Sequence, residues 1–129
     1  MRPPTILLVD DDDAIRRVIR AMLELYGYRV LDQGFPLAAC ALFDKDPSSI
    51  DLLLTDIKMP GMSGQALAAR IATLRPDLPI VFVSGYLDLT ALDNLQGPRH
   101  RVLAKPFEAE VLLRAVNELL SGAAVEDER

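Results

Sequence analysis

The chain has 129 residues, half of them hydrophobic, and this length is typical of one domain with a single hydrophobic core. A formal net charge of -5, without a cluster of basic residues, argues against direct binding of nucleic acid. No apolar run is long enough to cross a bilayer, and the N-terminus lacks the pattern of a signal peptide. We therefore expect a cytoplasmic protein without membrane insertion.

Short apolar segments alternate with segments of helical periodicity along the chain. Strands are expected at residues 5–9, 29–32, 51–55, 79–83 and 101–104. Helices are expected at residues 13–27, 36–45, 63–74, about 89–96, and 108–120. Gly27 is a stop signal for the first helix, and Ser63 is a candidate N-cap for the third.

Three of the expected helices carry apolar residues at the spacing of one helical face, and we expect these faces to be buried. The residues are Ile15, Val18, Ile19, Met22, Leu23 and Tyr26 in the first helix, Leu67, Ile71 and Leu74 in the third, and Leu112, Ala115, Val116 and Leu119 in the last. Cys40 lies in an apolar stretch and is expected to be a small core residue. His100 lies in a polar segment, interpreted as a loop, without a second histidine or a nearby cysteine, so a metal role is not expected.

Five apolar strands, each followed by a helix, predict an α/β fold: a five-stranded parallel sheet with helices on both faces and right-handed crossovers. The chain should form one domain over residues 1–129, with a core of about 4–121 and a solvated tail at 122–129. In such a sheet, functional groups collect beyond the carboxyl ends of the strands.

Polar residues follow four of the five predicted strands. Asp10 and Asp11 follow the first strand, and Asp56 follows the third. Ser84 follows the fourth strand, and Lys105 follows the fifth. The second strand ends with nothing comparable. We therefore expect three carboxylates, a hydroxyl and an ammonium group to converge on one rim of the sheet.

Each of these residues also has a simpler structural explanation. Asp12 or Asp13 is expected to cap the following helix or to be solvated. Asp56 alone could be a turn residue, Ser84 a loop residue, and Lys105 a solvated lysine. Those explanations do not account for the placement of the whole set at the ends of different strands.

The converging groups have a coherent chemistry. Carboxylates a few ångströms apart repel one another unless they take up protons or a cation. A set of oxygen ligands without histidine or cysteine favours a hard ion, and Mg²⁺ suits a site that also holds phosphate. Asp56 beside such an ion could act as a nucleophile, while Lys105 neutralises the transferred phosphoryl group and the Ser84 hydroxyl donates to it.

The ordered motifs resemble the receiver domain of bacterial two-component response regulators, with its flavodoxin-like (βα)5 fold. They are "ILLVDDDDAIRRVIRAML", "LLLTDIKMPGMSG", "PIVFVSGY" and "VLAKPF", and they extend over essentially the whole chain. The resemblance implies a signalling switch rather than an enzyme, although a receiver catalyses its own phosphoryl transfer and dephosphorylation.

The resemblance also implies a role for each residue of the set. Asp56 would be the phosphoacceptor and also a ligand of Mg²⁺, Asp11 a direct ligand of the ion, Asp10 a ligand through water, and Lys58 a ligand through its backbone carbonyl. Lys105 would pair with the phosphoryl group, and Ser84 would donate a hydrogen bond to it on activation. The Lys105-Pro106 peptide bond is expected to be cis.

The family transmits its signal by repacking the face formed by the fourth helix, fifth strand and fifth helix, here Leu89 to Leu119. An aromatic residue on the fifth strand normally takes part, but this chain has Val102 there, and Tyr86 is a candidate substitute. The resemblance implies a phosphodonor that is a sensor histidine kinase or a histidine phosphotransfer protein. The sequence leaves open which protein is the donor and what the downstream output is. It also leaves open whether the chain forms a homodimer, and whether it is a stand-alone receiver or a piece of a longer regulator or hybrid kinase.

Three alternatives are compatible with parts of the pattern. A Mg²⁺-dependent phosphohydrolase of the haloacid dehalogenase type would also use an aspartyl nucleophile, but in a D-x-D pattern after the first strand followed by a threonine, which "VDDDDAIRR" lacks. A flavin- or nucleotide-binding module would need a phosphate loop at that place instead of aspartates. A degenerate receiver could act as a protein-binding platform, although the complete set of site residues argues against it.

Overall fold

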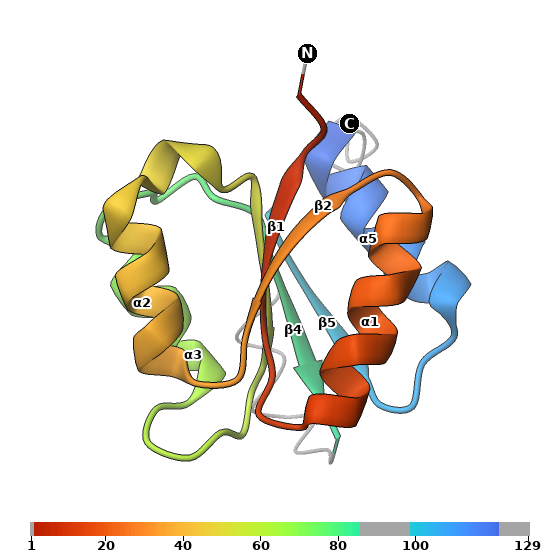
Figure 1. Cartoon of the computed structure of the whole chain (residues 1–129), viewed down its shortest axis with the longest axis horizontal. Helices are drawn as coiled ribbons and strands as arrows, with labels where there is room; N and C mark the ends of the chain where they lie inside the picture. The colour runs from red at the N-terminus through yellow and green to blue at the C-terminus, as the bar shows by residue number, and fades with distance from the viewer. Residues whose placement is uncertain (1, 86–98, 122–129) are drawn as a thin grey trace.

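The computed structural model describes residues 2–85 and 99–121 and forms a parallel sheet between two layers of helices (Figure 1). The strands are β1 (Thr5–Val9), β2 (Arg29–Gln33), β3 (Leu52–Asp56), β4 (Ile80–Ser84) and β5 (His100–Ala104). The helices are α1 (Asp13–Leu25), α2 (Pro36–Lys45), α3 (Gly64–Ala72) and α5 (Ala109–Ser121), with a short 3-10 helix at Pro47–Ser49. The predicted fold is confirmed.

The strand order is β2-β1-β3-β4-β5. The chain runs from β1 outward to β2 and then returns to the other side of β1 to form β3, so the order reverses between β1 and β3. Val9 pairs with Thr55 in the parallel register of these two strands. The residues just after Val9 and Thr55 therefore emerge side by side at the switch point of the sheet, where ligands bind in folds of this type.

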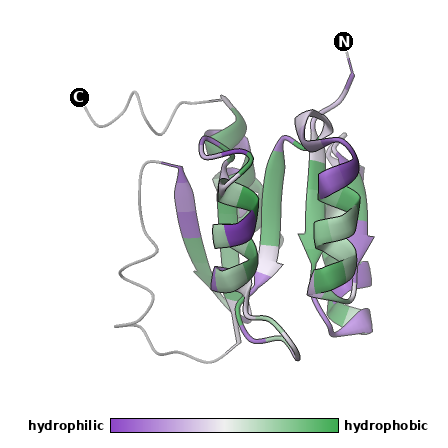
Figure 2. Cartoon of the chain, turned by 90° about the vertical axis from the view of Figure 1, so that its left-hand side faces the viewer, coloured by the Kyte–Doolittle hydropathy of each residue, from purple (hydrophilic) through white to green (hydrophobic). Residues whose placement is uncertain are grey.

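The core has two parts, one on each face of the sheet. Leu7 and Val9 of β1 face α2 and α3, whereas Ile6 and Leu8 face α1 and α5. This alternation follows from the period of two along a strand, and both faces are buried because helices cover both. The central strands are accordingly hydrophobic along most of their length (Figure 2).

Local signals place the ends of the helices that flank the site. The Asp12 side chain accepts hydrogen bonds from the backbone N–H groups of Ala14 and Ile15 at the start of α1. Gly27 has φ +93°, a conformation that favours glycine, so the predicted stop is confirmed. The Ser63 hydroxyl accepts from Ala66 N, which confirms the predicted cap of α3.

Some expectations about burial were wrong. Val18 of α1 is 56% exposed and Leu74 is 53% exposed, and Tyr26 is exposed as well. The buried stripe of α1 is narrower than its apolar pattern, with only Ile19 and Leu23 fully buried. Leu74 is exposed because α3 ends at Ala72, two residues earlier than expected.

His100 also differs from the expectation, because it begins β5 instead of lying in a loop. Its ring packs edge-on against Phe82, with the ring centroids 6.0 Å apart. Cys40 is buried, as expected for a core residue. The helix expected at about 89–96, Tyr86 and the tail at 122–129 lie outside the described residues. Within the described residues, no helix is long and apolar enough to cross a membrane.

Candidate functional site

Strand pairing brings three carboxylates together at the switch point. Asp10 follows β1 directly, and Asp56 is the last residue of β3, so the register places them next to each other. One oxygen atom from each of Asp10, Asp11 and Asp56 lies within 4.8 Å of the others. Asp10 is 1% exposed, whereas Asp11 is exposed to solvent. The convergence predicted for these three residues is therefore confirmed.

Lys105 enters the same site from the loop after β5. Its Nζ lies 3.1 Å from Asp10 Oδ2 and 3.5 Å from Asp56 Oδ2, so one ammonium group bridges the two carboxylates. Lys105 N also donates to Ser84 O at 2.7 Å, which joins the ends of β5 and β4. The Lys105-Pro106 bond is cis, as expected from the resemblance.

Asp10 is the most constrained of the three acids. Its Oδ1 accepts from Asp12 N at 2.9 Å, and its Oδ2 faces the Lys105 ammonium. On the main chain, Asp10 N donates to Gln33 O at 3.2 Å, and Asp10 O accepts from Arg16 Nη1 at 2.7 Å. A buried carboxylate needs such partners, and here they also fix the direction in which the carboxylate points.

Burial dominates the electrostatics of Asp56. Its side chain is 11% exposed, and this burial raises the pKa of the carboxyl above its ordinary value. The Lys105 ammonium lowers the pKa, and the Asp10 carboxylate raises it further. Asp56 Oδ1 also accepts from its own neighbour, Ile57 N, at 2.8 Å. The charged form of Asp56 is therefore costly until another cation arrives.

The donor set fits a hard divalent cation. It contains only carboxylate oxygens, and one of them, on Asp11, is open to solvent, which allows bound water to complete an octahedral shell. A thiolate or imidazole that would favour zinc is missing from the described part of this site. Lys58, two residues after Asp56, is exposed, and the role of its backbone carbonyl stays a prediction.

Ser84 and Val102 lie on the neighbouring strands. Ser84 is buried at the end of β4, where its backbone carbonyl accepts from Lys105 N, so the predicted hydroxyl is at the correct rim. Val102 in the middle of β5 pairs with Phe82 and packs, partly buried, against the part of the core that faces α2 and α3. An aliphatic residue thus occupies the place where the resemblance implies an aromatic one.

The structure adds a residue that the sequence patterns did not single out. Gly64, the first residue of α3, donates its N–H to Ile57 O at 2.8 Å. A Cβ atom at Gly64 would lie 2.1 Å from Asp56 O. The glycine therefore lets the start of α3 pack directly on the backbone of the acidic residue. The signal in the sequence was the second glycine of "GMSG", which follows Asp56 at the end of the loop.

Comparisons with known proteins agree with this geometry. The response regulator receiver domain family matches residues 6–117. The C4-dicarboxylate transport transcriptional regulatory protein DctD of Rhizobium meliloti (strain 1021) is 36% identical over 113 residues, or 87% of this chain and 24% of DctD. The response regulator receiver protein CpdR of Brucella abortus (strain 2308) is 37% identical over 119 residues, or 92% of this chain and 98% of CpdR.

A solved structure gives the same result for the fold. The crystal structure of a response regulator receiver domain protein from Clostridium thermocellum superposes with a TM-score of 0.86 at 28% identity, covering 95% of this chain and 98% of that one. The chain thus spans about a quarter of DctD and nearly the whole of CpdR. Receiver domains are signalling switches that are generally not classed as enzymes, and the family binds Mg²⁺ at an acidic site. On the strength of the matched residues and the shared fold, this chain belongs to the response regulator receiver domain family.

Proposed function

We propose that this protein is a phosphorylation-dependent switch that accepts a phosphoryl group on Asp56 in the presence of Mg²⁺. The observation that carries the proposal is the cluster of Asp10, Asp11 and Asp56, with the Lys105 ammonium held between two of these carboxylates. Acids that are only solvated or that cap a helix have no need of a shared lysine at the switch point of a sheet. Phosphoryl transfer needs that combination of a nucleophile and fixed positive charge.

In the proposed reaction, a carboxylate oxygen of Asp56 attacks the phosphorus atom of a phosphohistidine. The new bond joins this oxygen to phosphorus, while the bond from phosphorus to the histidine nitrogen breaks and its electron pair stays on the imidazole. The donor is a sensor histidine kinase or a histidine phosphotransfer protein. Lys105, which already contacts Asp56 in the resting state, pairs with the transferred group.

Asp11, Asp10, Asp56 and the Lys58 carbonyl are the proposed holders of Mg²⁺. Asp11 would hold the ion directly and Asp10 through water, and the exposure of Asp11 and the burial of Asp10 against Lys105 support these roles. When bound, the ion supplies charge neutralisation for the phosphoryl oxygens. The residues of the chain orient the Asp56 carboxylate and line the rest of the site.

The output step is proposed to start at Ser84. Its hydroxyl hydrogen-bonds the phosphoryl group, and the change passes to the face that includes β5 and α5. Val102 has no aromatic ring and packs, partly buried, against the core, so the aromatic rotamer change of the family is not available at this position, and Tyr86 is the proposed substitute. A downstream output domain or protein, as the name of DctD suggests for that relative, would read this face.

The test is intact-protein mass spectrometry after incubation with acetyl phosphate, with and without Mg²⁺. We expect the gain of one phosphoryl group in the wild type with Mg²⁺, and no gain in Asp56→Asn. Asp51→Asn, a change at the opposite end of β3, is the matched control and should be phosphorylated normally. An unmodified wild type that also releases no free phosphate above background would indicate a degenerate receiver. Steady phosphate release from unrelated phosphomonoesters would indicate a hydrolase.

A further inference from the structure

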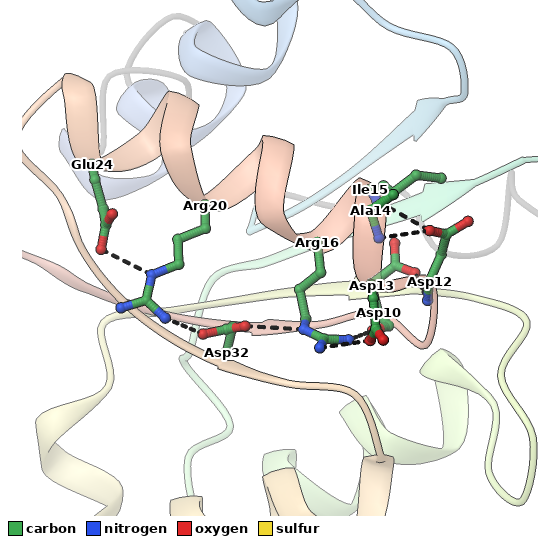
Figure 3. A network of polar contacts seen from close by, with 9 residues as sticks. All are labelled: Asp10, Asp12, Asp13, Ala14, Ile15, Arg16, Arg20, Glu24 and Asp32. Atoms are coloured by element: carbon green, nitrogen blue, oxygen red, sulfur yellow. Dashed lines mark hydrogen bonds and ion pairs between the residues drawn. The ribbon is translucent and has the colours of Figure 1, made fainter.

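The guanidinium group of Arg16 links the acidic loop after β1 to two other groups, the carboxylates of Asp13 and Asp32 (Figure 3). Its Nη1 donates to the backbone carbonyl of Asp10 at 2.7 Å, and its Nε donates to Asp32 Oδ2 at 3.0 Å. Its Nη2 lies 2.8 Å from Asp13 Oδ1. The contacts therefore come from the loop before α1, from the first turn of α1, and from β2.

The surroundings of this side chain are shaped around it. Arg16 is only 17% exposed, although it carries a permanent charge. A Cβ atom at Gly34, in the loop after β2, would lie 2.8 Å from Arg16 Nη1. Arg20, one turn further along α1, holds Asp32 from the other side and pairs with Glu24 at 3.0 Å. Asp32 thus pairs with both arginines.

We propose that Arg16 is a positioning residue for the metal site: by holding the Asp10 carbonyl, it fixes the peptide from which the Asp10 and Asp11 carboxylates extend. This inference rests on the proposed function. Arg16 does not contact the carboxylates that would bind the ion. Its bond to Asp10 is to the main-chain carbonyl. Its effect on Mg²⁺ must therefore come through geometry or through charge.

Geometry and charge predict opposite results when Arg16 is removed. A nearby positive charge repels a divalent cation, so the loss of this charge alone would strengthen Mg²⁺ binding. The loss of the bond to the Asp10 carbonyl frees the peptide between Asp10 and Asp11 to rotate, and that change would weaken Mg²⁺ binding. The direction of the change in affinity therefore separates the two explanations.

The experiment is a Mg²⁺ titration of the whole protein, followed by the amide signals of Asp11 and Asp12 in ¹H–¹⁵N spectra. We expect Arg16→Met to bind Mg²⁺ about tenfold more weakly than the wild type, in the range of other residues that hold metal ligands in place. Arg16→Lys should also bind more weakly, because a single ammonium cannot reach the carbonyl and both carboxylates in the geometry of a guanidinium. The remaining amide signals report whether each variant is folded.

Two further variants complete the test. Arg20→Met removes the same charge from the same helix and loses the same partner, Asp32, but it has no contact with Asp10, so its Mg²⁺ affinity should equal or slightly exceed that of the wild type. Gly34→Ala changes no charge and displaces only the flexible end of Arg16, so it should weaken Mg²⁺ binding about threefold.

The outcomes separate this inference from the function on which it rests. Wild-type amides that do not respond to Mg²⁺ would overturn the proposed metal site and the role of Arg16 with it. If the wild-type amide signals shift with Mg²⁺ and reach saturation, but Arg16→Met binds Mg²⁺ as tightly as the wild type or more tightly, the positioning role alone would be overturned. Equal weakening in Arg16→Met and Arg20→Met would also overturn it, because a general loss of stability in α1 would then explain both.

Discussion

Replacing Gly64 with alanine should disturb both the stability of the protein and the candidate site. The added Cβ would lie 2.1 Å from Asp56 O, 3.0 Å from the carbonyl carbon of Asp56 and 3.1 Å from Ile57 Cα. The first of these distances is more than about 1 Å inside normal contact. All three neighbouring atoms belong to the backbone, so no side-chain rotation can relieve the clash.

The size of the effect follows from three terms. Forcing extra volume into a packed site typically costs about 1–3 kcal/mol. Moving α3 away would also weaken the bond from Gly64 N to Ile57 O, which contributes about 1 kcal/mol. Alanine gains at most about 1 kcal/mol over glycine in a helix, and less at the first position. The clash therefore wins, and we expect a net loss of about 2–3 kcal/mol in the free energy of unfolding.

The assay is urea unfolding followed by circular dichroism, with Gly85→Ala as the matched control. A Cβ at Gly85 would meet only Lys105 Cδ at 3.7 Å, an ordinary contact, so this variant should stay within about 0.5 kcal/mol of the wild type. Phosphorylation of folded Gly64→Ala should also be slower, because the clash displaces the backbone of Asp56. A Gly64→Ala protein as stable as the control would refute the reasoning.

Three other substitutions or treatments have expected outcomes. Asp56→Asn should stabilise the Mg²⁺-free protein near pH 7, because the pKa of Asp56 is raised on folding. The gain should vanish as the pH falls through this raised pKa towards the ordinary value of 3.8, as thermal unfolding at several pH values would show. Burial raises the pKa of the Cys40 thiol, so iodoacetamide should modify it slowly until denaturant is added, and rapid alkylation of the native protein would contradict its core position. Arg75→Met should lower the free energy of unfolding in urea by about 1–2 kcal/mol, because Arg75 Nη1 donates to the carbonyls of Pro47 and Ile50. Arg70→Met, which loses an exposed ion pair, should lower it much less. Equal losses would show that the two carbonyl contacts are unimportant.

Strand positions could be predicted to within about one residue at each end because the physics behind them is local. An apolar run of four or five residues between polar segments is typical of a strand that is buried on both faces, as in a parallel sheet. The carboxyl ends of parallel strands point the same way, so Asp10 and Asp56 had to reach one rim once β1 and β3 were neighbours. Caps such as Asp12 and Ser63 depend only on residues within one turn, and both were predicted correctly.

Features that depend on distant partners were missed. The exposure of Val18 depends on which elements pack against α1, which its own periodicity does not contain. His100 looked like part of a polar loop, but the ladder to β4 and the ring of Phe82 draw it into β5. Arg16 is a long side chain whose three partners come from different segments, and the close approach at Gly64 becomes visible only when α3 is placed against β3.

The charges of the site explain why cation binding and phosphorylation should be coupled. Three clustered carboxylates face a single ammonium, that of Lys105, so acidic groups outnumber basic ones in the described site. A divalent cation cancels that excess. A phosphoryl group would add further negative charge to a largely buried aspartate whose pKa is already raised, and Lys105 alone could not balance it. The arrangement that makes the resting site unfavourable is therefore the one that makes transfer to Asp56 depend on the ion.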